Sequence, residues 1–155
     1  MATLLCQIEA CLNSRPLSQL STNPEDPYPL TPSHFLVGEP LVAPPDFNYE
    51  STNVGLLRRW QLTQRMMQDF WRRWSHEFLT QLQHRYKWKD GCGEPSVGDV
   101  VLVKEDDLPP SRWLMGRIVS THPGTDNCTR VVSLKCKSKI IKRPLSKLVF
   151  LPAIE

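Results

Sequence analysis

Proline is spread so unevenly along this chain that it decides where a long helix can form. The 155 residues include 14 prolines, yet residues 54–87 contain none, and Gly55 is their one glycine. Proline inside a helix removes a hydrogen bond and clashes with the preceding turn, so a stretch free of it favours a helix. Apolar residues recur there at steps of three, four or seven: Leu56, Trp60, Met67, Trp71, Trp74, Phe78 and Leu82. The pattern predicts one amphipathic helix about 50 Å long, with its arginines opposite the aromatic face.

The segment that follows this helix has the features of a small β-domain. Gly91, Gly93 and Pro95 end the helix, and apolar residues then recur with period two. We expect five short strands, at residues 97–103, 113–121, 130–137, 140–142 and 148–151. Strands this short, in so small a segment, favour a five-stranded SH3-like β-barrel.

The N-terminal third predicts one helix followed by an extended connection. Leu4, Leu5, Ile8 and Leu12 lie at helical spacing, and the helix at residues 2–13 ends before Pro16. Its apolar stripe needs a partner, so the helix packs elsewhere in the chain or is loosely held. Residues 18–52 are rich in Pro, Ser, Thr and Asn, with one short ordered piece expected at 33–37. The expected fold is α+β, in three parts: residues 1–53, 54–90 and 91–155.

Charge is distributed as unevenly as proline. Residues 1–55 carry one basic and six acidic side chains, a net charge of −5. Residues 56–90 have a net charge of +5 and residues 91–155 of +3. The total of +3 therefore combines an acidic N-terminal third with a basic body, residues 56–155. A basic body favours a polyanionic partner such as DNA.

The cysteines indicate free thiols rather than disulfides or a metal site. Their positions include no Cys-x-x-Cys pair: Cys6, Cys11, Cys92, Cys128 and Cys136. The apolar residues 1–6 lack a basic region before them, so neither a secretory signal nor a membrane span is predicted. We therefore expect a nuclear or cytoplasmic protein that is not secreted. A zinc site made of Cys92, Cys128, Cys136 and His84 is disfavoured by its spacing. No Gly-rich phosphate loop or nucleophile motif occurs, and no metal, cofactor or small-molecule substrate is expected.

The third expected strand carries the clearest functional signal. Val132, Leu134 and Cys136 alternate with Ser133, Lys135 and Lys137, so the first set is expected to be buried and the second displayed. More cations surround this strand, and no acid occurs between residues 126 and 155; these cations are Arg130, Lys139, Lys142, Arg143 and Lys147. Together these cations would form a positively charged ridge along one face of the strand. Such a ridge would bind DNA phosphates, because each neutralised phosphate releases condensed counterions. The alternative is a solvated edge, where lysines discourage strand pairing.

The long helix allows two interpretations of its own. Arg58, Arg65 and Arg72 lie seven residues apart and fit a phosphate backbone, but they also fit solubility and local ion pairs such as Asp69 with Arg73. Trp71 and Trp74 belong to a face too bulky to leave in water. We expect that face to cover the β-domain and the first helix, or to pair with another subunit.

Two early motifs resemble a known family. Ile8-Glu9-Ala10-Cys11-Leu12-Asn13-Ser14-Arg15-Pro16-Leu17 and Leu30-Thr31-Pro32-Ser33-His34-Phe35-Leu36-Val37-Gly38 are similar to the end of the catalytic core in integrases of Pao/BEL LTR retrotransposons. The later segment from Asp107 to Trp113, with Gly116 to Val119, also resembles that family. The resemblance implies a core remnant, a linking helix and a C-terminal SH3-like domain.

The resemblance also implies what the chain does. The two Asp and one Glu that hold the catalytic metals in such integrases lie before this chain's first helix, and Glu9 follows the usual place of that Glu. We therefore expect no enzyme activity, but a share in DNA integration: binding duplex DNA through phosphates, with little sequence preference. The alternative is a protein-interaction or self-association module that uses the Trp-rich helix or the barrel. A tail of a longer reading frame, or a genomic fragment with no selected role, also fits the sequence.

Overall fold

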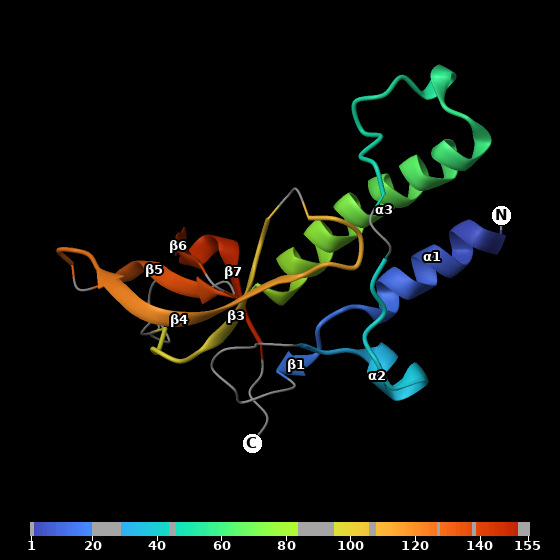
Figure 1. Ribbon diagram of the computed structural model, residues 1–155. Coiled ribbons are helices and arrows are strands. Elements are labelled where there is room, and N and C mark those ends of the chain that lie inside the picture. Colours follow the sequence, from blue (N-terminus) through green and yellow to red (C-terminus); the bar gives the residue numbers. More distant parts are fainter. Residues whose placement is uncertain are drawn as a thin grey trace.

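The fold joins three helices to a five-stranded antiparallel sheet, as the computed structural model shows (Figure 1). The structure describes residues 2–19, 29–43, 46–83, 95–105, 108–126, 128–137 and 139–151. The first part contains α1 (Ala2–Asn13), a two-stranded ladder of β1 (Ser18–Gln19) with β2 (Pro29–Leu30), and α2 (Pro32–Val37). The predicted α+β class is confirmed, and the ordered piece expected at residues 33–37 lies in α2.

The long helix is shorter than predicted at its start. It is α3 (Arg59–Leu82), with 24 residues and therefore about 36 Å long. The 3₁₀ helix η1 (Val54–Leu56) precedes it, because Asn53 accepts a hydrogen bond from the Gly55 N–H and closes a separate turn. Leu57 and Arg58 are extended, and the Arg58 N–H donates to Gln61 Oε1 at 2.9 Å as α3 begins. Residues 84–87, which were predicted to continue the helix, lie outside the described residues.

The five predicted strands are present, but they form an open sheet. The strands are β3 (Val100–Val103), β4 (Leu114–Pro123), β5 (Thr129–Cys136), β6 (Lys139–Pro144) and β7 (Leu148–Phe150). Their order is β6-β5-β4-β3-β7, all antiparallel. The predicted SH3-like barrel is wrong, because closure would require β6 to pair with β7. The 3₁₀ turn η2 (Leu145–Lys147) joins these two strands, which form opposite edges of the sheet.

Both faces of the sheet are apolar near β3. Val101 and Val103 face one cluster, together with residues of β4, β5 and β7: Ile118, Val132, Leu134, Cys136 and Leu148. Val100 and Leu102 face the other cluster, where Leu79 of α3 packs on Met115, Val149 and Leu151. The end of α3 therefore covers one face of the sheet at β3 and β7. Neighbouring residues of β3 belong to different clusters, because successive side chains of a strand point to opposite faces.

The first helix packs along α3. Leu4, Ile8 and Cys11, spaced four and three residues apart, contact the cluster formed by Met67 and Trp71. Leu5 was expected on the same stripe but is 64% exposed. We expected α1 either to pack elsewhere in the chain or to be loosely held. The structure shows the first, with α3 as the partner. No helix in the described ranges has the length and hydropathy needed to cross a membrane.

Candidate nucleic-acid interface

Apart from Arg130, the cations predicted around the third strand lie at the β6 edge of the sheet, but on two faces rather than one. Cross-strand pairing puts Lys135 opposite Ile140 and Lys142 opposite Ser133, while Lys139 pairs with Cys136 and Arg143 with Val132. Paired residues share a face, so Lys135 and Lys142 lie on one side and Lys139 and Arg143 on the other. The expectation of a single ridge is therefore wrong. The physical reason is parity: Lys139 and Lys142 are three residues apart on a strand with period two.

The expected alternation along β5 is largely confirmed. Val132, Leu134 and Cys136 are buried. Lys135 is half-buried and Lys137 is exposed, at a turn with φ of 51°. Ser133 was expected to be displayed, but it is buried, with its Oγ 2.8 Å from His122 Nε2. Local pattern did not indicate this His122–Ser133 contact, because it depends on the register between β4 and β5.

Four ammonium groups are available to a polyanion. Lys137, Lys139, Lys142 and Lys147 are exposed, and their ammonium groups make no hydrogen bond or ion pair within the described residues. Two other cations predicted in this region, Lys135 and Arg143, are engaged. Lys135 already interacts with another group of the chain. Arg143 Nη2 donates a hydrogen bond to Glu105 Oε2 at 2.9 Å.

Arg130 lies at the far end of β5 and pairs with an acid there. Its Nη1 donates to Asp126 Oδ1 at 3.2 Å in the β4–β5 turn. This hydrogen bond lowers the pKa of Asp126 below its usual range. Arg130 is therefore separated from the lysines at the other end of the strand and partly neutralised.

Two arginines of α3, Arg65 and Arg72, bind the segment that precedes the helix. Arg65 donates to Asp69 at 3.0 Å and to the Tyr49 carbonyl, and Arg72 pairs with Asp69 at 3.1 Å and Glu50 at 3.2 Å. The predicted Asp69–Arg73 pair is wrong, because Arg73 pairs with Glu77 at 3.0 Å, one turn further along. Of the three arginines proposed to follow a phosphate backbone, Arg58 has no acidic partner among the described residues.

Two of the three tryptophans of α3, Trp71 and Trp74, belong to the core, whereas Trp60 is 57% exposed, contrary to the expectation for the aromatic face. Trp71 is 4% exposed, and its indole N–H donates to the Leu108 carbonyl at 3.0 Å. Its ring lies 4.9 Å from that of Trp113 and 5.8 Å from that of Trp74, between centroids. Trp113 donates in turn to Ser14 Oγ at 3.3 Å. The aromatic face therefore covers the first helix and the start of the sheet, which was the first of the two expected arrangements.

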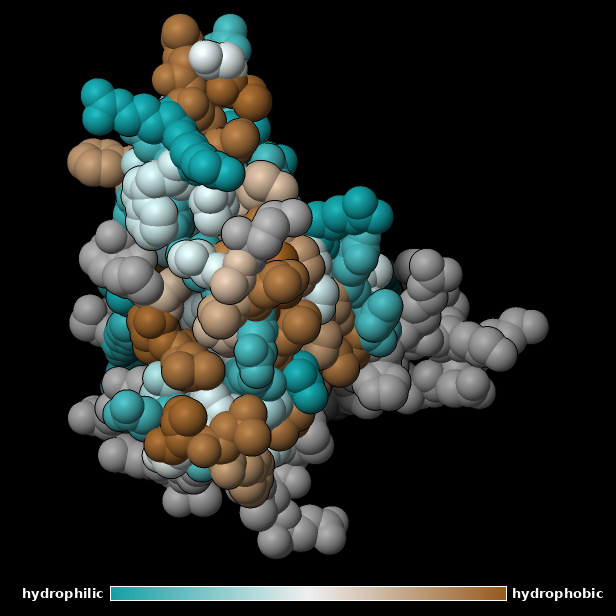
Figure 2. Space-filling model, turned by 90° about the vertical axis from the view of Figure 1, so that its right-hand side faces the viewer, coloured by the Kyte–Doolittle hydropathy of each residue, from teal (hydrophilic) through white to brown (hydrophobic). Residues whose placement is uncertain are grey.

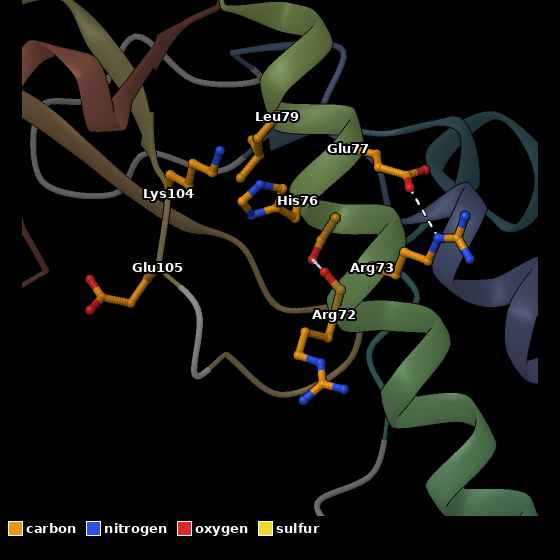
Figure 3. Close-up of a pocket in the computed structure, with 8 residues that line it drawn as sticks. Arg72, Arg73, His76, Glu77, Leu79, Lys104 and Glu105 are labelled. Carbon is orange, nitrogen blue, oxygen red and sulfur yellow. Dashed lines mark hydrogen bonds and ion pairs between the residues drawn. The ribbon is translucent and has the colours of Figure 1, made fainter. Parts of the chain in front are cut away.

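A hollow of about 330 Å³ between α3 and the residues after β3 also carries cations (Figure 3). Lys104 and His76 reach toward it, whereas Arg73 turns to Glu77. Lys104 Nζ donates to Thr80 Oγ1 at 2.9 Å. Because Glu77 and Glu105 line the same hollow, its charge is largely balanced. It is a weaker candidate for phosphate binding than the β6 edge.

The four cysteines that the structure describes fall into two classes. Cys6 and Cys128 are exposed, while Cys11 and Cys136 are buried, and burial raises the pKa of both buried thiols. Cys128 and Cys136 stand about 25 Å apart along the strand, too far to share a metal. Cys92 and His84, the other two residues of the disfavoured zinc set, lie outside the described residues. Across the described ranges, no three His, Cys, Asp or Glu residues gather in a metal-binding group.

We predict that alkylation separates these two classes. At pH 8, iodoacetamide should modify Cys6 and Cys128 within minutes, and Cys11 and Cys136 at least about tenfold more slowly, because the thiolate is the nucleophile. Peptide mass mapping over time measures the rates, and the same reaction in urea is the control. Equal rates for these four of the five thiols in the native protein would contradict the burial of Cys11 and Cys136.

Comparison with known proteins gives one match. A family model described as "Family of unknown function (DUF5641)" matches residues 58–151, more than half of the chain. The match covers α3 and the whole sheet but not α1, which packs on α3. No curated protein and no solved structure matches.

Proposed function

We propose that this chain, which belongs to the DUF5641 family of unknown function, is a DNA-binding part of a retrotransposon integrase. The two N-terminal motifs and their order before a long helix and a basic β-domain support the integrase assignment. The proposed role is binding and assembly during DNA integration, without catalysis by the residues of this chain. It binds duplex DNA through phosphates, with little preference for sequence.

The observation that carries the proposal is the exposed charge along the β6 edge. Lys137, Lys139, Lys142 and Lys147 have no acidic partner among the described residues, so each can neutralise a phosphate. No acid lies between residues 126 and 155 in the sequence. Each neutralised phosphate releases condensed counterions, which makes such binding favourable at low salt.

The two-faced arrangement also bears on how duplex DNA is held. Lys142 lies on one face of the edge strand and Lys139 on the other. A strand with cations on both faces can reach phosphates on both sides of a groove, whereas a flat ridge meets one backbone. The major groove is wide enough for a β-ribbon. We therefore propose contact along the β6 edge rather than across a sheet face.

Charge reversal at this edge tests the proposal. The double variant Lys139→Glu/Lys142→Glu should bind a random duplex at least about tenfold more weakly and lower the slope of log affinity against log salt by about 2. Fluorescence anisotropy across a salt series measures both. The matched control is Arg59→Glu/Arg73→Glu, which changes net charge equally at exposed positions of α3 and should weaken binding far less. Equal losses in the two variants, or binding insensitive to salt, would refute contact at the β6 edge.

A second candidate function is protein interaction through apolar surface. Trp71 and Trp74 are covered, but other apolar side chains are exposed over α1, α2 and the loop that leads to α3, as Figure 2 shows from that side. They include Leu5, Phe35, Leu36, Val37 and Leu56. Contiguous exposed apolar surface commonly marks an interaction site. Sedimentation analysis of the free chain distinguishes the two functions: association that survives high salt favours the second.

A further inference from the structure

A cavity of about 360 Å³ lies between α1, the first half of α3 and two loops, well apart from the β6 edge. Its walls are mostly apolar and include Ala10, Val42, Trp60, Met67 and Pro110. Trp60 is 57% exposed, so its ring stands partly open to solvent where it borders the cavity. Concave, mainly apolar cavities of this size with a few polar groups are typical binding sites.

Two side-chain amides in this cavity have unused hydrogen-bonding capacity. Gln7 Oε1 is buried without a partner in the described part of the chain. Gln64 is 8% exposed, and its side chain makes no hydrogen bond to any described residue. Buried amides normally find partners, because desolvation without one costs free energy. These two amides are therefore available to a ligand.

Three other polar side chains that line the cavity, those of Gln68, Cys11 and Ser111, already have hydrogen-bond partners. Gln68 accepts from the Tyr49 N–H at 3.0 Å and donates to the Phe47 carbonyl at 2.7 Å. Cys11 Sγ and Ser111 Oγ lie 3.1 Å apart and share a hydrogen bond. These hydrogen bonds hold Gln68, Cys11 and Ser111 in place. The side-chain amides of Gln7 and Gln64 can therefore form hydrogen bonds to a polar group of a ligand.

A smaller hollow of about 160 Å³ adjoins the cavity, and its lining carries two carboxylates, Asp46 and Glu50, and one guanidinium, Arg72. The two share Asp46, Gln68, Pro109 and Pro110 as lining residues. Glu50 lines the smaller hollow but pairs with Arg72 at 3.2 Å. Asp46 accepts the Phe47 N–H at 2.7 Å and has no cationic partner among the described residues. A free carboxylate therefore stands beside an apolar cavity.

We propose that the joined hollows bind a short peptide segment of a partner protein, with one apolar side chain in the larger hollow and an Arg or Lys over Asp46. A peptide group offers one donor and one acceptor, which match the two glutamine amides. Rotation about the last side-chain bond turns Gln7 Oε1 toward the cavity at little cost, because such terminal torsions are broad. The Asp46 carboxylate favours a basic peptide and disfavours a phosphate, so this site is distinct from the DNA-binding edge.

Capped dipeptides test the proposal on the full chain by NMR. Acetyl-Leu-Arg-amide should shift the side-chain amide signals of Gln7 and Gln64 and the indole signal of Trp60, saturating in the millimolar range. Acetyl-Leu-Glu-amide should bind about threefold more weakly or worse, because it lacks the ion pair with Asp46. Acetyl-Gly-Arg-amide should bind at least about tenfold more weakly, because it lacks the apolar anchor.

A cavity-filling variant locates the binding. Ala10→Trp places an indole in the larger hollow and should abolish the shifts, whereas Ala2→Trp makes the same change at an exposed position of the same helix and should preserve them. If Ala10→Trp fails to fold, the three dipeptides on the unmodified chain decide alone. Equal affinity for all three, no binding by any of them, or undiminished shifts in folded Ala10→Trp would overturn the proposal.

Discussion

Replacing Trp71 by alanine should destabilise the fold by about 3–5 kcal/mol, the usual cost of removing a large buried aromatic side chain. Trp71 is 4% exposed and lies where α1, α3 and Trp113 meet. The substitution leaves a cavity and also leaves the Leu108 carbonyl without its donor. Since domains of this size are stable by about 5–15 kcal/mol, the loss is a large part of the total.

Urea unfolding followed by far-UV circular dichroism measures this effect. Trp60→Ala is the matched control, because Trp60 is on the same helix but 57% exposed, and it should cost less than about 1 kcal/mol. Similar costs for the two variants would contradict a core at Trp71. The result also decides how binding data are interpreted: lost DNA binding in Trp71→Ala would report unfolding, not a missing contact to DNA.

The second large effect is expected at Gly116, where Gly116→Ala should cost about 3 kcal/mol. A Cβ atom at this position would lie 2.6 Å from Cys136 Sγ and 3.3 Å from Leu134 Cβ. Leu134 is fully buried between neighbouring strands and has little room to move. The substitution overpacks the core at a point where β4 and β5 approach closely.

A double variant separates this steric cause from a general loss of backbone freedom. Cys136→Ala removes the sulfur atom that a Cβ at Gly116 would meet, so Gly116→Ala/Cys136→Ala should recover at least about 1 kcal/mol relative to the sum of the single changes. Gly55→Ala is the control, because its nearest contact would be at an ordinary 3.6 Å. Urea midpoints of the unmodified protein, the two single variants and the double variant supply the cycle. Strict additivity of the Gly116 and Cys136 changes would rule out the proposed clash.

Local pattern was enough to locate most elements. The proline-free stretch with its three- and four-residue apolar spacing located α3, and period-two alternation located all five strands of the larger sheet. The burial of Val132, Leu134 and Cys136 followed from that alternation. The start of α3 was misplaced, because the Asn53 side chain closes a separate turn that apolar spacing does not reveal.

The arrangement of the candidate sites depended on contacts between distant segments. The lysines divide between two faces because of the register of β6 against β5, and the sheet is open because its edge strands, β6 and β7, do not pair with each other. The cavity beside α1 combines Gln7, Gln64 and Asp46, which have no recognisable spacing in sequence.

The amino-acid sequence by itself determined the element types, the charge of each segment and the aromatic face of α3, because these depend on neighbours within a few residues. The tertiary structure alone decided that α1 completes the core around Trp71, that Arg65 and Arg72 are paired with acids, and that Lys137, Lys139, Lys142 and Lys147 stay available. These outcomes depend on which surfaces meet, and packing between residues far apart in the chain sets that choice.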